Sequence, residues 1–256
     1  METSQQLLWQ LQQEVKSLRE ELEVVKKGYF ETITCKTWKV VDADGKTRIS
    51  AVTSVNGIAG VTWLDKDGKK RMDAATSAGG DAGVTWLDKD EKLRIGAGTL
   101  ADGEASVTLL DKDGKRRIEA ITLADGYAGV LWFDKDEKSR IKASTFADGE
   151  ASVQWLDKDG KHRITAVTSD GGSASVVWRD KDGKERIAAT TFAAGDASVT
   201  WRDKDGKKRI TAVTTDPGMA LVLWLDKDEK MRIGAGTIDD LLFHLPTKDL
   251  NLPKEP

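Results

Sequence analysis

Residues 163–185 read Arg-Ile-Thr-Ala-Val-Thr-Ser-Asp-Gly-Gly-Ser-Ala-Ser-Val-Val-Trp-Arg-Asp-Lys-Asp-Gly-Lys-Glu, two alternating runs separated by two kinds of turn signal. Alternation with a period of two is typical of β-strands, and Gly-containing clusters between such runs indicate hairpin turns. This unit recurs every 23 residues, nine times, without insertion or deletion. A fixed period of about 20 to 50 residues predicts a repeat protein whose units pack mainly on their neighbours.

Each repeat carries one Asp and, six residues later, one Arg. The aspartates are Asp42, Asp65, Asp88, Asp111, Asp134, Asp157, Asp180, Asp203 and Asp226, and the arginines are Arg48, Arg71, Arg94, Arg117, Arg140, Arg163, Arg186, Arg209 and Arg232. The Asp opens the second turn, where an Asp side chain commonly accepts hydrogen bonds from the amides of its own turn. We therefore interpret Asp-x-Asp-Gly as turn chemistry rather than as a calcium loop, which needs further oxygen ligands at fixed positions. The Arg is expected on the outer face, paired with carboxylates near the turns.

The two turns differ in sequence. Ala-Asp-Gly at 101–103 predicts a three-residue hairpin loop with a left-handed Gly. Asp-Lys-Asp-Gly at 65–68 fits a four-residue loop that also ends in a left-handed Gly. Three repeats place a glutamate at that second Gly position, and a left-handed backbone would strain these residues. They are Glu91, Glu137 and Glu229.

Strand registers follow from centring the first turn on Gly79 and the second between Lys66 and Asp67. The expected pairs are Met72 with Trp86, Ala74 with Val84 and Thr76 with Ala82 across the first turn, and Val61 with Met72 and Ala59 with Ala74 across the second. Both turns put Ile or Met, Ala, Thr, Ala, Val and Trp on one face. The sequence therefore predicts a mainly β fold, an antiparallel meander of about eighteen short strands, with the Trp residues in the core.

A one-layer sheet with an apolar face must cover that face. Because the inward Ala, Thr and Val are small, we expect three chains to form a trimeric β-prism rod, with a monomeric β-solenoid of two sheets as the alternative. Eighteen strands in a row would span about 85 Å, and nine stacked coils about half that length.

Residues 1–27 predict a parallel coiled-coil helix. Spacings of three and four join the apolar residues of its seam, which are Leu8, Leu11, Val15, Leu18, Leu22 and Val25. With Leu8 at position a, the flanking residues offer the opposite-charge pairs Glu14 with Arg19 and Glu21 with Lys26 between parallel chains. A single amphipathic helix folded onto the repeats is the alternative.

The remaining segments are short. Residues 28–41 predict a lead-in strand, 42–237 the repeat array, and 238–256 a C-terminal cap or tail. The tail departs from the repeat pattern and is apolar. We interpret it as a cap over the last repeat or as a docking segment for a partner protein, through Leu241, Leu242, Phe243 and Leu245.

Composition argues against several functions. Lys and Arg number 40 and Asp and Glu 43, spread through every repeat, so nothing resembles a nucleic-acid-binding stripe. We expect no nucleic-acid partner, no cofactor and no metal site. The only histidines, His162 and His244, stand at a variable turn position and in the tail, and no nucleophile recurs beside a base, so an enzyme is not expected.

The termini and the single cysteine bear on cellular address. The N-terminus lacks the pattern of a signal peptide, and no run of about 18 apolar residues predicts membrane insertion. A cytoplasmic or virion- or assembly-associated address is expected. Cys35 alone excludes an intramolecular disulfide, and we expect its thiol to be buried.

Residues 40–49, Val-Val-Asp-Ala-Asp-Gly-Lys-Thr-Arg-Ile, follow the heptad helix. This order resembles a class of uncharacterised bacterial proteins in which a coiled coil leads into repeated Asp-x-x-Gly-x-x-Arg hairpins; the class implies no activity. The unit also resembles MORN repeats in length and the YD repeats of toxin shells in Trp-Leu-Asp-Lys-Asp-Gly-Lys, although the MORN Tyr-x-Gly-x-Trp core and the YD Tyr-x-Tyr-Asp are missing. In design the chain is similar to trimeric phage-type fibre stalks.

These observations predict a non-enzymatic structural protein, a self-associating rod or spacer. The partner expected first is a second and third copy of the chain, as a homotrimer. The alternative is a binding module that recognises a glycan or a protein through its outer face or its C-terminal tail. The recurring Trp could form an aromatic ladder for sugars, but Trp shares a face with Val and Ala and is expected to be core.

Overall fold

The computed structural model describes residues 4–27, 35–215, 218–238 and 241–245. One helix, α1 (Ser4–Lys27), precedes a sheet of 19 strands. The strands are β1 (Thr37–Val41), β2 (Thr47–Thr53), β3 (Ala59–Leu64), β4 (Lys70–Thr76), β5 (Ala82–Leu87), β6 (Leu93–Thr99), β7 (Ala105–Leu110), β8 (Arg116–Thr122), β9 (Ala128–Phe133), β10 (Ser139–Thr145), β11 (Ala151–Leu156), β12 (His162–Thr168), β13 (Ala174–Arg179), β14 (Glu185–Thr191), β15 (Ala197–Arg202), β16 (Lys208–Thr215), β17 (Met219–Leu225), β18 (Met231–Ile238) and β19 (Leu241–Leu245).

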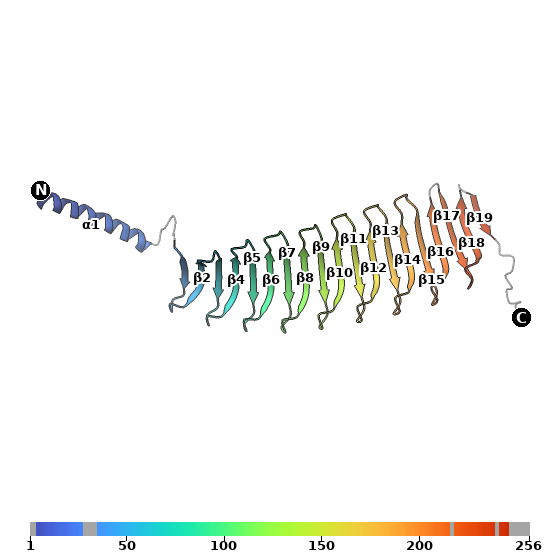
Figure 1. Cartoon of the computed structure of the whole chain (residues 1–256), viewed down its shortest axis with the longest axis horizontal. Coiled ribbons are helices and arrows are strands. Elements are labelled where there is room, and N and C mark those ends of the chain that lie inside the picture. Colours follow the sequence, from blue (N-terminus) through green and yellow to red (C-terminus); the bar gives the residue numbers. More distant parts are fainter. Residues whose placement is uncertain (1–3, 28–34, 216–217, 239–240, 246–256) are drawn as a thin grey trace.

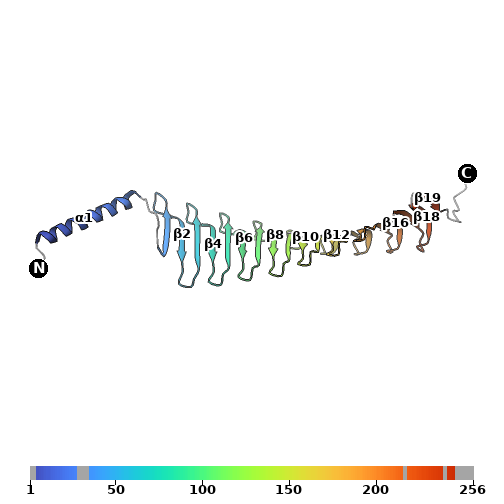
Figure 2. The same ribbon diagram turned by 90° about the horizontal axis from the view of Figure 1, so that it is seen from above.

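Every strand pairs antiparallel with the next one in the chain, so the sheet is an uninterrupted meander (Figure 1). At about 4.8 Å per strand the array is about 85 Å long. It is a single open layer whose strand direction turns along its length (Figure 2), the twist expected of any sheet. The expected mainly β repeat fold is confirmed. The units follow one another as in a solenoid, but they lie in one layer rather than in two sheets.

Both kinds of turn close in the same way. In the first, the amide of Ser77 donates to the carbonyl of Asp81 at 2.8 Å and Gly80 is left-handed, with φ of 96°. In the second, the amide of Asp65 donates to the carbonyl of Lys69 at 2.9 Å and Gly68 has φ of 79°. The left-handed glycines are confirmed. The second loop has three residues, however, and the expected four-residue loop is wrong.

Each turn of the second kind, which opens with the recurring Asp, is followed by a β-bulge that shifts the pairing of its two strands. Across the first turn the predicted register is correct, with Met72 facing Trp86. Across the second, Trp63 faces Met72 but Leu64 faces Lys70, so Arg71 is an extra residue on its strand. The predicted pairing of Val61 with Met72 is therefore wrong by two residues. Because the side-chain period is two, this error leaves every residue on its predicted face.

The described chain has no buried hydrophobic residue. The face that carries Ile, Ala, Thr, Val and Trp is half-exposed along its length, and five of its Trp side chains keep between 36% and 39% of their surface open. The expected Trp core is therefore not formed within one chain. The physical reason is geometric, since a single layer has nothing to lay over its own apolar face.

The three glutamates at the second-turn Gly position are left-handed, as expected, with φ near 60°. Each side chain reaches back one repeat. Glu91 Oε1 accepts a hydrogen bond from the amide of Lys70 at 3.0 Å, and Glu137 and Glu229 accept equivalent bonds from Arg116 and Lys208. These amides lie beside the bulge residue of the preceding repeat. The backbone strain at Glu91 is thus offset by a bond that ties two repeats together.

Substitutions at Glu91 test this balance. Ala keeps the left-handed backbone and removes the hydrogen bond, whereas Gly removes both the strain and the bond. We expect Glu91→Ala to unfold with a free energy lower than that of Glu91→Gly by about 1 to 2 kcal/mol, the cost of a left-handed L-residue. Chemical denaturation followed by circular dichroism measures both values.

Gly160→Ala is the matched control, because Gly160 has φ of 79° and a Cβ there would meet nothing within 4 Å. It should lose as much stability relative to the wild type as Glu91→Ala loses relative to Glu91→Gly. Equal stability of Glu91→Ala and Glu91→Gly would contradict the account.

Candidate assembly surfaces

The predicted coiled-coil seam lies on α1 and is open to solvent. The six seam residues Leu8, Leu11, Val15, Leu18, Leu22 and Val25 keep between 43% and 60% of their surface exposed. The helix contacts none of the described strands, and Figure 1 shows it standing away from the sheet. The alternative of a helix folded onto the repeats therefore fails within the described chain. Exposed apolar stripes of this length are typical of interaction surfaces.

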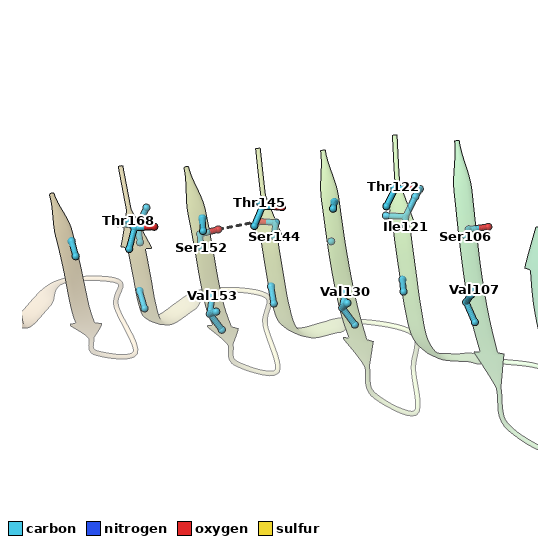
Figure 3. A pocket seen from close by; sticks show the side chains of 18 of the residues that line it. Ser106, Val107, Ile121, Thr122, Val130, Ser144, Thr145, Ser152, Val153 and Thr168 are labelled. Carbon is cyan, nitrogen blue, oxygen red and sulfur yellow. Dashed lines mark hydrogen bonds between the residues drawn. The ribbon is translucent and has the colours of Figure 1, made fainter. Parts of the chain in front are cut away.

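The sheet carries a second unpartnered surface, a long apolar groove. Its central part, of about 1300 Å³, runs from β5 to β15 and takes three consecutive residues from each strand, such as Ala105, Ser106 and Val107. Figure 3 shows Val107, Val130 and Val153 in one row on the alternate strands β7, β9 and β11. The same triplets continue the groove toward the N-terminus down to Cys35 and toward the C-terminus up to Thr237. The groove thus follows the whole array.

Small side chains make this groove possible. Its lining is Ala, Val, Thr, Ser and Gly, with Ile121 the largest side chain in the central part. On the face opposite to Val153, the hydroxyls of Ser144 and Ser152 lie 3.1 Å apart across neighbouring strands, and Ser152 is 6% exposed (Figure 3). Such a floor lets another backbone or a second sheet approach closely. It holds no convergent set of polar or titratable groups of the kind that an enzyme site requires.

The recurring Asp anchors its own turn, as predicted. Asp65 Oδ1 accepts hydrogen bonds from the amides of Asp67 at 2.9 Å and Lys69 at 3.0 Å, and the same pair of bonds recurs in all nine repeats. The other carboxylate oxygen pairs with the recurring Arg; in the third repeat, Arg94 Nη2 donates to Asp88 Oδ2. The carboxylate is thereby satisfied on both oxygens.

The Arg also joins successive repeats, which the sequence analysis missed. Arg94 Nη1 donates to the backbone carbonyl of Asp111, the turn residue of the next repeat, and four other repeats show the same bond. Lysines add a parallel tie, as Lys115 Nζ donates to the carbonyl of Lys135 at 2.9 Å. The unvarying six-residue spacing of Asp and Arg was the available signal. We call this chain of bonds the Asp–Arg ladder.

The ladder sets the charge state of its carboxylates. Burial raises the pKa of Asp88, but hydrogen bonds from the amides of Lys92 and Asp90 and the Arg94 guanidinium outweigh it and lower the pKa to about 2. Asp134 has the same surroundings and the same pKa of about 2. The other aspartates of the ladder from Asp65 to Asp226 shift in the same direction.

Other predicted positions do not gather into a site. Leu241, Leu242, Phe243 and Leu245 belong to β19, which pairs with β18; their side chains lie outside the described residues, so their docking role stays a prediction. His162 begins β12 and is exposed.

Two kinds of feature are absent from the described residues. Among them, no group of three or more His, Cys, Asp or Glu is placed to hold a metal ion. Within the same part of the chain, no helix is long and apolar enough to cross a membrane. Cys35 is exposed, so the expected buried thiol is wrong for the isolated chain.

Comparisons with known proteins add little. The sequence matches no protein-family model and no curated protein. Among solved structures, the chain is similar to the TCP domain of SAS-4 (dCPAP) from Drosophila melanogaster, solved in complex with a proline-rich motif of Ana2 (dSTIL). The two are 13% identical over 76% of this chain and 94% of that one, with a TM-score of 0.30. This likeness is too weak to carry an argument.

The depressed pKa values predict how acid acts on the ladder. The unfolded pKa of Asp is about 3.9 and the folded pKa of Asp88 is lower, so the stabilisation is complete above about pH 4 and is lost as the pH falls toward about 2. We expect Asp88→Asn to be less stable than the wild type at pH 7. The difference in unfolding free energy should shrink between pH 4 and pH 2. Denaturation at several pH values measures it.

Asp90→Asn serves as the control, because Asp90 lies in the same turn without an Arg partner. Its effect should be smaller than that of Asp88→Asn at pH 7. A stability difference for Asp88→Asn that persists unchanged at pH 2 would contradict the charge account of the ladder.

Proposed function

We propose that this chain is a non-enzymatic structural protein, a self-associating rod or spacer. In this proposal α1 gathers parallel chains and the array supplies length and stiffness. The observation that supports it most is the absence of any buried hydrophobic residue in the described part of a chain that is otherwise regularly folded. A folded sheet of this size needs an apolar interior, and self-association would supply one.

The exposed surface gives this argument a scale. The chain exposes 18213 Å², whereas a compact monomer of 28.0 kDa would expose about 11,000 Å². The excess of about 7,000 Å² is comparable with the large, apolar interfaces of obligate oligomers, which bury about 2,000 to 5,000 Å² or more. A permanent assembly of several chains therefore fits the surface better than a transient contact.

A parallel trimer is the form that we favour. The seam of α1 allows Glu14 of one chain to meet Arg19 of its neighbour only when the helices run in the same direction. Three sheets around one axis would bring their Trp-bearing faces together, and the small Ala, Val and Thr of these faces suit a crowded axis. The Asp–Arg ladder keeps every repeat at the same spacing, which suits a rod.

Mass in solution tests the proposal directly. Light scattering on the full chain should give three times 28.0 kDa, about 84 kDa. Removing residues 1–27 should leave a folded array that associates more weakly than the full chain, because α1 no longer raises the local concentration of the arrays. Its dissociation constant should therefore be higher. A mass of 28 kDa both with and without residues 1–27 would contradict self-association and would favour the binding-module alternative.

Two neighbouring residues on opposite faces test which surface is covered. Val153 lies opposite Ala143 on the face that carries Trp155, whereas Gln154 lies opposite Lys142 on the other face. We expect Val153→Glu to lower the mass toward that of one chain, since a buried unpaired charge costs several kcal/mol per copy. Gln154→Glu should leave the mass unchanged. Equal masses of the two variants would show that the Trp-bearing face is not the interface.

A further inference from the structure

Two rows of turns, one at each end of the strands, border the sheet along its length, and they differ in charge. One edge consists of the first turns, at 54–58, 77–81, 100–104, 123–127, 146–150, 169–173 and 192–196; we call it the acidic edge. It carries eight Asp and Glu and no Lys, Arg or His. The other consists of the second turns with their bulges, at 42–48, 65–71, 88–94, 111–117, 134–140, 157–163, 180–186, 203–209 and 226–232; we call it the basic edge. It carries 29 Lys and Arg against 22 Asp and Glu.

Three carboxylates of the acidic edge, those of Asp81, Glu104 and Glu150, have no cation of their own among the described residues. Within the described residues, Glu104 and Glu150 form no ion pair, and Asp81 accepts hydrogen bonds only from neutral groups, the hydroxyl of Ser77 and the amide of Ala101. On the basic edge, ladder lysines such as Lys115 donate to backbone carbonyls and so keep their positive charge unneutralised. The acidic edge therefore has unmet negative charge and the basic edge has unmet positive charge.

The acidic edge also exposes apolar side chains. Leu100, Phe146 and Phe192 keep between 41% and 51% of their surface open. The aliphatic stems of lysines can cover such groups while their ammonium heads meet carboxylates. The basic edge supplies those lysines at every repeat. The charge of the acidic edge and its exposed apolar side chains are thus both complemented by the lysines of a basic edge.

We propose that the acidic edge of one chain packs against the basic edge of a second copy, with the two chains parallel. This inference rests on the proposed self-association. Rotation about an axis along the rod places unlike edges together, whereas an antiparallel pair packed face to face would place each edge against its own kind and repel. The charge difference between the edges therefore selects a cyclic, parallel assembly and gives the interface a direction.

Zero-length carbodiimide cross-linking of the full chain tests the contact, because it joins a carboxylate to an amine only where the two touch. Strands of six or seven residues hold the two edges of one chain about 20 Å apart. A link between the edges must therefore be intermolecular. We expect links from Glu104 and Glu150 to basic-edge lysines, identified by peptide mass spectrometry.

The repeat numbers of the linked residues report orientation. In a parallel cyclic assembly, neighbours lie at the same height, so the offset between the linked repeats should be the same for Glu104 and Glu150. An offset that changes along the rod would indicate antiparallel chains and would overturn the proposal. Links within one edge only would do the same.

Glu104→Lys with Glu150→Lys completes the test. These changes should remove the links at both positions and make the assembly dissociate at lower salt than the wild type does. Glu20→Lys with Glu23→Lys adds the same charge on α1 and should leave the edge links intact. A multimer without edge links would refute this contact while sparing the rod proposal, and a 28 kDa monomer would contradict the rod proposal itself.

Discussion

A single antiparallel layer has no interior, and this constraint governs everything else in the molecule. Each strand is satisfied by its two neighbours through backbone hydrogen bonds, yet its apolar side chains face nothing within the described chain. Backbone pairing alone gives little net stability in water, because the unfolded chain bonds to water instead. Every strand is thus paired along its backbone, while the apolar side chains of the described chain remain exposed to solvent.

The Asp–Arg ladder fixes the spacing of successive repeats, although the apolar side chains of the sheet stay exposed. Each carboxylate serves its own turn, and in most repeats the guanidinium reaches from that turn to the next. Ion pairs this exposed contribute little one at a time, but here each is joined to backbone bonds and repeated along one edge. The ladder therefore acts more as a spacer of repeats than as a source of large stabilisation. It also leaves that edge rich in cations.

Most of the fold could be predicted from the sequence, because each pattern of strand and turn residues recurs in nine repeats and can be compared among them. The alternation assigned residues such as Val84 and Trp86 to their face, and Gly103 marked its turn. The second-turn register was missed because the bulge at Arg71 has no signature in residue type. The reach of Glu91 to the preceding repeat was missed because it joins residues 21 positions apart. The sequence indicated that one layer must cover its apolar face, and the structure shows that the described part of one chain leaves its Trp side chains partly exposed.

The turn that follows each recurring Asp closes with the same pair of hydrogen bonds, from its own amides to the Asp carboxylate, in all nine repeats. Excising or duplicating 23 residues would therefore rejoin the chain at a junction that already exists elsewhere in it. Length becomes a discrete quantity, changing by two strand spacings, about 9.6 Å, at each step. Recombination between near-identical gene segments could lengthen or shorten such a rod without redesigning any contact. The length of the array is therefore set by the number of repeats that its gene encodes.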